Sequence, residues 1–356
     1  FGPRLLSNFM RDTGNQVVLG TFIATFMYCL LILRTVRSVE SGPFVPHLSV
    51  SVGIILIVIS LGVLIYFIHH VAISIQADNL IASVGRDLEQ AIERLFPNQR
   101  RRWRLFEPKL RQKKDLPEDF EQNSYPISSN QSGYVQAVDL KQLMRIATKH
   151  DLIVRLGYRP GEFVVKGDAL AQAYPQKELN SEIAAKIKDN FLLGPQRLRV
   201  QDVEFSINQL VQIALRALSS AINDPITAMA CLDQLGVALA RLAERTIPPA
   251  YRYDRNGNLR LMVDAVTFAG LTDAAFNQIR QSARTNAAVT IRLLEIIAIV
   301  MAKTIHPDER AALLRQAHMI RCGSQEAIPE EQDRQDIEDQ YQIILKVLEQ
   351  HHASSL

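Results

Sequence analysis

Cysteine is scarce in this chain, which has only three among 356 residues. Cys29 lies in an apolar stretch, and Cys231 and Cys322 lie far apart in segments with a helical pattern. This spacing provides neither a disulfide framework nor a set of metal ligands, and it suits a protein that faces a reducing compartment. The sequence begins with Phe1 in place of a methionine, so we expect further residues upstream in the full protein.

Sequence motifs of catalysis are missing as well. The sequence has no P-loop, no nucleophile elbow, no H-E-x-x-H pair and no dinucleotide-binding fingerprint. Its adjacent carboxylates, as at Glu330 and Glu331, lie in a strongly charged stretch that is typical of a solvent-exposed segment. We therefore predict that the chain is not an enzyme and that it uses no cofactor.

Charge is almost absent from two runs within residues 1–70. Residues 17–36 contain only Arg34, and residues 48–68 contain no charged residue. At about 1.5 Å per residue, each run is long enough to cross a hydrocarbon core of roughly 30 Å. Two such runs in succession predict a transmembrane helical hairpin, in preference to a signal peptide or a buried core helix.

The basic residues predict the orientation of this hairpin. Arg4 and Arg11 precede the first run and a dense basic cluster follows the second, whereas the short connection has only Arg34 and Arg37. By the positive-inside rule, both outer ends of the hairpin and the large region that follows lie in the cytoplasm. We therefore expect a multi-pass protein of the plasma membrane with a cytoplasmic C-terminal region.

The first run differs from the second in its small and polar residues. They include Gly20, Thr21, Ala24, Thr25 and Tyr28. Small residues allow helices to approach closely within a bilayer. We interpret this set as a packing face against another helix, and the alternative is a face that lines a water-filled permeation path.

Two histidines, His69 and His70, follow the second run at the expected membrane boundary. Histidine can bind a metal or respond to pH. Adjacent residues on a helix point about 100° apart, because one turn takes 3.6 residues, so the pair alone makes a poor chelate. We interpret the histidines as interfacial anchors, and they are the weak candidates for a metal or sensor site.

Residues 71–130 combine a long amphipathic helix, expected over 71–96, with a basic linker. Residues 100–114 contain eight basic residues and one acidic residue. A basic cluster with aromatic residues favours contact with anionic lipid headgroups, and a solvated linker is the alternative. Nucleic acid is a less economical partner for a membrane-tethered protein. The expected headgroup contacts are Arg100, Arg101, Arg102, Trp103 and Arg104.

Residues 131–176 change to short alternating segments that predict strands at 133–139, 152–156 and 163–165, with a helix at 140–149. The run 160–170 resembles barrel-sandwich modules of the biotinyl and lipoyl type. Lys166 lies in a corner turn and not in a Met-Lys-Met-like hairpin, so this resemblance implies a small β-barrel-like module without the cofactor.

A helical domain is expected over residues 177–322, and its most distinctive feature is a corner before Pro225. Asn223 tolerates unusual backbone angles, Asp224 is a natural N-cap, and Pro225 suits the first position of a helix that continues through Thr227. We interpret this motif as a structural corner. An anion site at the helix start is the alternative, which the negative charge of Asp224 disfavours.

Two further helices complete the prediction. Residues 287–302 are apolar enough to resemble a span, but Arg292 and Glu295 interrupt them and can pair on a helix surface, so we predict a buried core helix. Residues 323–356 carry an apolar stripe amid many charges. This C-terminal amphipathic helix either docks on the body of the protein or pairs with a neighbouring subunit.

Several motifs together resemble a family of bacterial membrane proteins known as domain of unknown function 2254. They are the run Gly14 to Gly20, His69 and His70 with Ser74 to Gln76, residues 160–170, and Ala214 to Ala228 with its Asn-Asp-Pro motif. Ser220 stands where the family pattern has proline. The resemblance implies a bacterial inner-membrane location and two further spans upstream, hence a four-helix membrane region. It implies no established activity or site residues.

The combined prediction is a mainly α-helical membrane protein with a transmembrane hairpin, a cytoplasmic β-barrel-like module and a helical domain. Membrane lipids are its expected partners, and a small-molecule ligand is left open. We expect a homo-oligomeric assembly that forms or gates a channel, or acts in transport. The alternative is a membrane-anchored scaffold or ligand sensor with a cytoplasmic binding domain.

Overall fold

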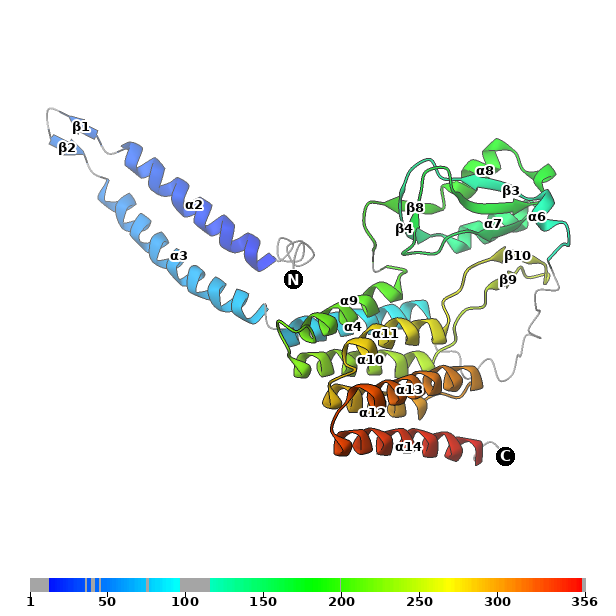
Figure 1. The fold of residues 1–356 in the computed structure, drawn as a ribbon. Helices are drawn as coiled ribbons and strands as arrows, with labels where there is room; N and C mark the ends of the chain where they lie inside the picture. Colours follow the sequence, from blue (N-terminus) through cyan, green and yellow to red (C-terminus); the bar gives the residue numbers. More distant parts are fainter. Residues whose placement is uncertain are drawn as a thin grey trace. The chain divides into compact units, whose positions relative to one another are not determined.

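The computed structural model describes residues 13–35, 37–39, 42–44, 46–74, 77–96, 116–198 and 200–353 (Figure 1). The chain divides into two compact units, Phe1–Leu80 and Ile81–Leu356. We call the first the hairpin unit and the second the large unit, and each is described by itself.

The hairpin unit consists of helices α2 (Thr13–Thr35) and α3 (His47–Ser74), which pack against each other. Both predicted spans are therefore helices, and their windows Gln16–Arg34 and His47–Ile68 are long and apolar enough to cross a membrane. Their apolar side chains are mostly exposed, as expected where lipid replaces a protein core. The connection, predicted only as a short link, contains the antiparallel strands β1 (Arg37–Val39) and β2 (Gly42–Phe44).

Helix α4 (Ala77–Leu95) begins three residues after α3 ends. Ile81, Val84, Leu88 and Ile92 recur at helical spacing and are all buried, as the predicted amphipathic stripe requires. The end predicted at Phe96 is confirmed, because the amide of Phe96 still donates to the carbonyl of Ile92. Residues 75 and 76 lie outside the described residues, so the single continuous helix over 71–96 stays a prediction.

Short strands and helices follow from residue 116. They are α6 (Phe120–Asn123), β3 (Tyr125–Ser128), β4 (Gly133–Val138), α7 (Leu140–Lys149), β5 (Ile153–Leu156), β6 (Phe163–Val164), β7 (Ala169–Tyr174), the short 3-10 helix η2 (Gln176–Glu178), α8 (Ser181–Lys188) and β8 (Phe191–Gly194). The strands and the helix predicted over 133–165 agree closely with β4, α7, β5 and β6. Alternation and capping are local patterns, so the sequence of this stretch was sufficient to predict these elements.

The sheets of this region are not the module that was predicted over 131–176. One sheet has the order β3-β7-β5-β10-β9 and includes β9 (Tyr251–Tyr253) and β10 (Leu259–Met262), and the other has the order β6-β4-β8. β10 pairs in parallel with β5 although more than a hundred residues separate them. The module therefore starts earlier, ends later and includes distant strands, and its barrel-like closure is not confirmed. We call residues 116–198 with β9 and β10 the mixed module.

The remaining helices form a layer around an apolar core. They are α9 (Val203–Ala217), α10 (Pro225–Ala243), α11 (Phe268–Ser282), α12 (Ala287–Met301), α13 (Pro307–Ala327) and α14 (Glu331–Ala353). With α4 they make up the helical layer. α10 packs against α9 and α12, and α14 packs against α12 and α13. The buried helix predicted over 287–302 is α12, in which Arg292 bonds Glu295 at 2.7 Å and also Asp233.

The helices α14 and α10 add to what the sequence predicted. α14 buries Ile337, Tyr341 and Ile344, so the C-terminal stripe docks on the body of the protein. α10 is also long and apolar enough to cross a membrane by length and composition, which the sequence analysis did not note. Half of its apolar window is buried within the large unit, where Cys231 and Leu235 are fully enclosed.

Candidate functional site

Two of the small and polar residues of α2 contact α3. Thr25 is buried and its hydroxyl lies 2.8 Å from that of Ser60 on α3, while the Tyr28 hydroxyl donates to the carbonyl of Ser49 at 3.3 Å. These two residues therefore hold the hairpin together, which supports the packing interpretation for them. Thr21 donates to the carbonyl of Val17 within its own helix.

Gly20 and Ala24 lie at the exposed edge of the same stripe of α2, since Ala24 is one turn from both Gly20 and Tyr28. Both are exposed, and a Cβ atom added at Gly20 would meet no atom within 4 Å. One turn separates the two residues, so together they form an open small-residue face on the helix. The predicted set of five therefore forms one stripe with a packed edge at Thr25 and an open edge at Gly20 and Ala24.

The side chains of two other predicted sites lie outside the described residues. The backbone of His69 and His70 is helical within α3, but their side chains are outside the described residues. The headgroup contacts predicted at Arg100 to Arg104 also lie outside them. Across the described part of the chain, no three His, Cys, Asp or Glu side chains are grouped so that they could hold a metal ion.

The corner between α9 and α10 has the geometry that its sequence predicts. Asn223 has a φ of 47°, in the left-handed region that asparagine tolerates. The carboxylate of Asp224 accepts the amide of Thr227 at 3.1 Å and its hydroxyl at 2.6 Å, and these bonds lower the pKa of Asp224. Pro225 is the first residue of α10. Because Asp224 caps the helix, the structural interpretation accounts for the motif.

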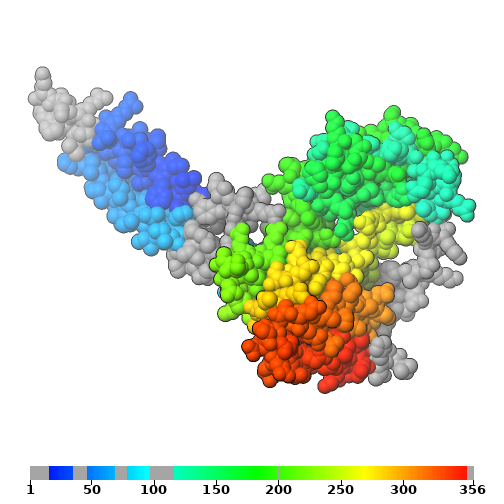
Figure 2. All heavy atoms as spheres, in the orientation of Figure 1, coloured from blue at the N-terminus to red at the C-terminus, as the bar shows by residue number. Residues whose placement is uncertain are grey.

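A cleft of about 770 Å³ lies between the mixed module and the helical layer, within the large unit. Three crossing segments of the chain border it, at residues 201–204, 247–252 and 263–266. In Figure 2, the yellow atoms of the segment with β9 and β10 lie against the green and teal atoms of the mixed module. Its apolar wall includes Leu95, Phe96, Phe191, Ile247, Val263 and Val266.

Asp202 fixes the first crossing segment. It is 4% exposed, caps α9 through the amide of Phe205 at 2.9 Å, and accepts two bonds from Arg197 at 2.6 and 2.8 Å. Burial raises the pKa of Asp202 above its ordinary value, and the hydrogen bond from Arg197 opposes that rise. Gly161, with a φ of 98°, lies against the Asp202 carboxylate and leaves no space for a side chain. The turn of the mixed module can therefore approach α9 closely.

Further polar bonds hold the cleft in shape. The side-chain amide of Gln201 pairs with the backbone of Val138 at 3.0 and 3.3 Å, in the manner of a strand neighbour. Arg94, at the end of α4, donates to the carbonyl of Val200 at 2.7 Å. Arg159 bonds Glu204 at 3.0 Å and so joins the mixed module to the first turn of α9.

Arg252 on β9 differs from Arg94 and Arg159 of the same cleft. Its Nε is buried and has no hydrogen-bond partner among the described residues, and burial lowers its pKa. A buried N–H group without an acceptor is costly, because its desolvation is not compensated by a hydrogen bond. Acidic residues also line the cleft, but Asp202 and Glu204 are already bonded to arginines, and Asp139, Asp189 and Asp264 are exposed.

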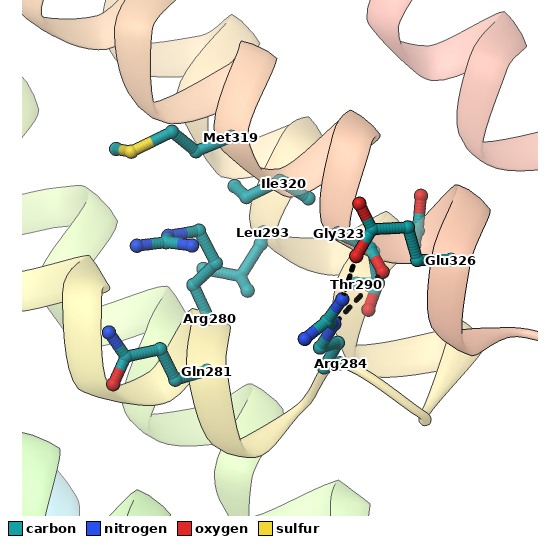
Figure 3. Close-up of a pocket in the computed structure, with 10 residues that line it drawn as sticks. Arg280, Gln281, Arg284, Thr290, Leu293, Met319, Ile320, Gly323 and Glu326 are labelled. Carbon is teal, nitrogen blue, oxygen red and sulfur yellow. Dashed lines mark hydrogen bonds and ion pairs between the residues drawn. The ribbon is translucent and has the colours of Figure 1, made fainter.

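A second cavity of about 280 Å³ lies between α11 and α13. Figure 3 shows Arg280 of α11 and Arg284 of the turn that follows it beside α13, with Arg284 bonded to Glu326 and to the carbonyl of Gly323. This ion pair already neutralises one of the two cations beside the cavity. Since the cavity is also near the lower end of the volumes that ligand sites occupy, roughly 300–1,000 Å³, the larger cleft is the stronger candidate.

Similarity to known proteins extends over most of the chain. Residues 1–298 match the model of a family described as predicted membrane protein (DUF2254). The chain belongs to this family. Uncharacterized proteins of Mycobacterium tuberculosis and Mycobacterium bovis are each 30% identical to it over 339 residues, which is 94% of this chain and 64% of theirs. The chain thus spans less than two thirds of these family members. No solved structure matches it.

Membership confirms the resemblance that the Asn-Asp-Pro motif and the N-terminal run carried. It does not single out Arg252, and neither did the sequence analysis. Arg252 lies in Tyr251-Arg252-Tyr253, an alternating triplet that is typical of a short strand. This pattern does not indicate whether the arginine side chain has a hydrogen-bond acceptor. The signal that could have been used is the unusual position of two strands inside a helical region.

Proposed function

We propose that this protein is a membrane-anchored ligand sensor that binds a small anion in the cleft, on the cytoplasmic side of a bacterial inner membrane. The carrying observation is the buried, unpaired Nε of Arg252. The volume of about 770 Å³ and the apolar wall suit a ligand in which an anionic group is joined to an apolar body. A carboxylate or phosphate beside Arg252 would supply the acceptor that the guanidinium lacks.

The position of the cleft supports a sensing role. Arg94, Leu95 and Phe96 line it and form the last turn of α4, whose first residue lies three positions after the end of α3. A ligand that draws on Arg94 or displaces Phe96 would act on the helix that leads to the membrane. Sites between modules joined by several crossing segments are suited to closure on a ligand.

The test compares Arg252→Met with Arg255→Met, in which an exposed arginine of the adjacent turn is replaced. Without ligand, we expect Arg252→Met to raise the melting temperature by roughly 2–4 °C, about 1 kcal/mol, because it removes a buried Nε that has no acceptor among the described residues. Benzoate is the probe and benzamide its uncharged counterpart, and melting is measured in nanodiscs. Benzoate should stabilise the native protein and Arg255→Met but not Arg252→Met, and benzamide should stabilise none of them.

The melting temperature without ligand distinguishes two explanations for a failure of benzoate to stabilise the protein: benzoate is the wrong ligand, or the anion site does not exist. If Arg252→Met lowered the melting temperature without any ligand, the guanidinium would already be satisfied within the protein. The proposed anion site would then be wrong, whatever benzoate does.

The open face of α2 favours a second proposal, that several copies associate through Gly20 and Ala24 to form a channel or transport-related assembly. Small residues one turn apart permit close helix contact in a bilayer. We expect the double variant Gly20→Leu, Ala24→Leu to have a lower subunit number by native mass spectrometry than the native protein. Leu30→Phe, which adds bulk elsewhere on the exposed surface of α2, is the control. A native protein that is monomeric in the mildest detergents contradicts the proposal.

A further inference from the structure

The α9–α10 corner, residues 218–226, exposes two isoleucines that no packing within the large unit explains. Ile226 is 74% exposed and Ile222 is 53% exposed. A single exposed isoleucine is ordinary on a protein surface. These two lie together around a rigid, capped turn, so the position of that turn in the fold decides what they can contact.

The contacts between α4 and α10 give that position. Gly85 lies against Gln234, Glu89 and Glu93 bond Arg241 at 2.7 and 3.0 Å, and the carbonyl of Phe96 accepts from Arg245. Residue numbers rise together along both helices, so α4 and α10 run parallel. Counting back eight residues from the Gly85–Gln234 contact leads to the first residue of α4 and to Ile226.

The start of α4 is held near the membrane by the chain itself. Ala77 follows Ser74, the last residue of α3, by three positions, which span at most about 11 Å when fully extended. The corner lies at the same end of the helical layer as the start of α4 (Figure 1). Its isoleucines therefore belong to the end of the large unit that the chain tethers to the bilayer.

The composition of the corner identifies the occupant. Asp224 is the only charged residue within 218–226, and its carboxylate is already bonded to Thr227. A surface without free charge has no electrostatic preference among headgroups. We infer that Ile222 and Ile226 insert into the interfacial layer of the bilayer and dock the large unit on the membrane. This contact is independent of the proposed ligand site, which lies near the opposite end of α4.

Depth-dependent fluorescence quenching tests the inference on the full chain. The sequence has one tryptophan, so Trp103→Phe provides a background without that emission. Ile226→Trp is introduced into it, with Val165→Trp as the control. Val165 is 53% exposed and belongs to the mixed module, from which the 15 residues of α9 lead to the corner. Both variants are placed in bilayers of phosphatidylcholine with and without bromine on the acyl chains.

An apolar side chain of an interfacial segment lies roughly 5–10 Å inside the headgroup–acyl boundary. We therefore expect brominated lipid to quench most of the emission of Ile226→Trp and little of that of Val165→Trp, and we expect anionic phosphatidylglycerol to change neither result. No quenching at either position would overturn the inference, and so would equal quenching at both. A blue-shifted but unquenched Ile226→Trp would also overturn it, because that result indicates burial by another copy of the chain.

Discussion

Arg197→Met is expected to lower the melting temperature of the large unit by roughly 6–12 °C, which corresponds to about 3 kcal/mol. The reason is that the variant removes the counter-ion bonded to the carboxylate of Asp202, which is 4% exposed, and leaves only the more distant Arg159. Removing one partner of a buried pair costs about 3–5 kcal/mol, and the low end applies because the Arg197 side chain is 26% exposed. Differential scanning fluorimetry or circular dichroism in nanodiscs measures the shift.

The pH dependence of this effect has a definite sign. The folded pKa of Asp202 is already raised above its ordinary value of 3.8 by burial, with Arg197 opposing the rise. Without Arg197 the rise is larger, so the stability that the protonated acid preserves is present at low pH and lost as the pH increases through the folded pKa. The difference between native protein and variant should therefore shrink as the pH is lowered from neutrality toward that pKa.

The double variant Arg197→Met, Asp202→Asn is the control. Asparagine still caps α9 but carries no charge, so most of the lost stability should return. If the double variant were no more stable than Arg197→Met, the loss would come from the contacts of the arginine side chain and not from the orphaned carboxylate. Arg197 also lies over the ring of Phe205, at 5.6 Å, which makes this comparison necessary.

The second large effect is expected from Leu261→Ala, which should destabilise the large unit by about 2–5 kcal/mol. Leu261 is fully buried in the apolar core of the mixed module, although it comes from β10, between two helices of the helical layer. Its neighbour across the sheet is Val154 of β5. The alanine leaves a cavity in the core and weakens the strand that joins the two parts.

Hydrogen exchange measured by mass spectrometry reports amide protection in the mixed module and in the helical layer separately. We expect Leu261→Ala to weaken protection in β5, β7 and α7 together with the segments that lead into α11. Leu192→Ala is the control, since Leu192 is 54% exposed and an exposed substitution changes stability by about 0.5 kcal/mol or less. Loss of protection confined to β10 would show that the mixed module is stable without that strand.

Local signals account for the parts of the fold that were predicted. The span windows follow from missing charge, and the corner at Asn223, Asp224 and Pro225 follows from capping and turn chemistry that acts within a few residues. The predicted helix 140–149 coincides with α7 because its caps and apolar spacing are both contained in ten residues. The predictions that the chain is not an enzyme and uses no cofactor stay predictions.

The module boundaries and the site were missed because they depend on distant parts of the chain. No local sequence pattern predicts that β10 pairs with β5, because the register of a strand pair depends on both strands. The same holds for Thr25 and Gly20, which belong to the same predicted set but differ in burial. Only the packing of α3 shows that Thr25 holds the hairpin and that Gly20 lies open.

The sequence by itself therefore determined that this chain belongs to a membrane protein family and has two N-terminal helices long and apolar enough to span a membrane, a capped corner and a series of amphipathic helices, because periodicity and charge act along the chain. The tertiary structure decided which charged groups find partners. Arg197 meets Asp202, and Arg159 meets Glu204, whereas the Nε of Arg252 is enclosed without an acceptor. It also decided that α4 and α10 run parallel, because side-chain contacts between separate helices fix their relative direction.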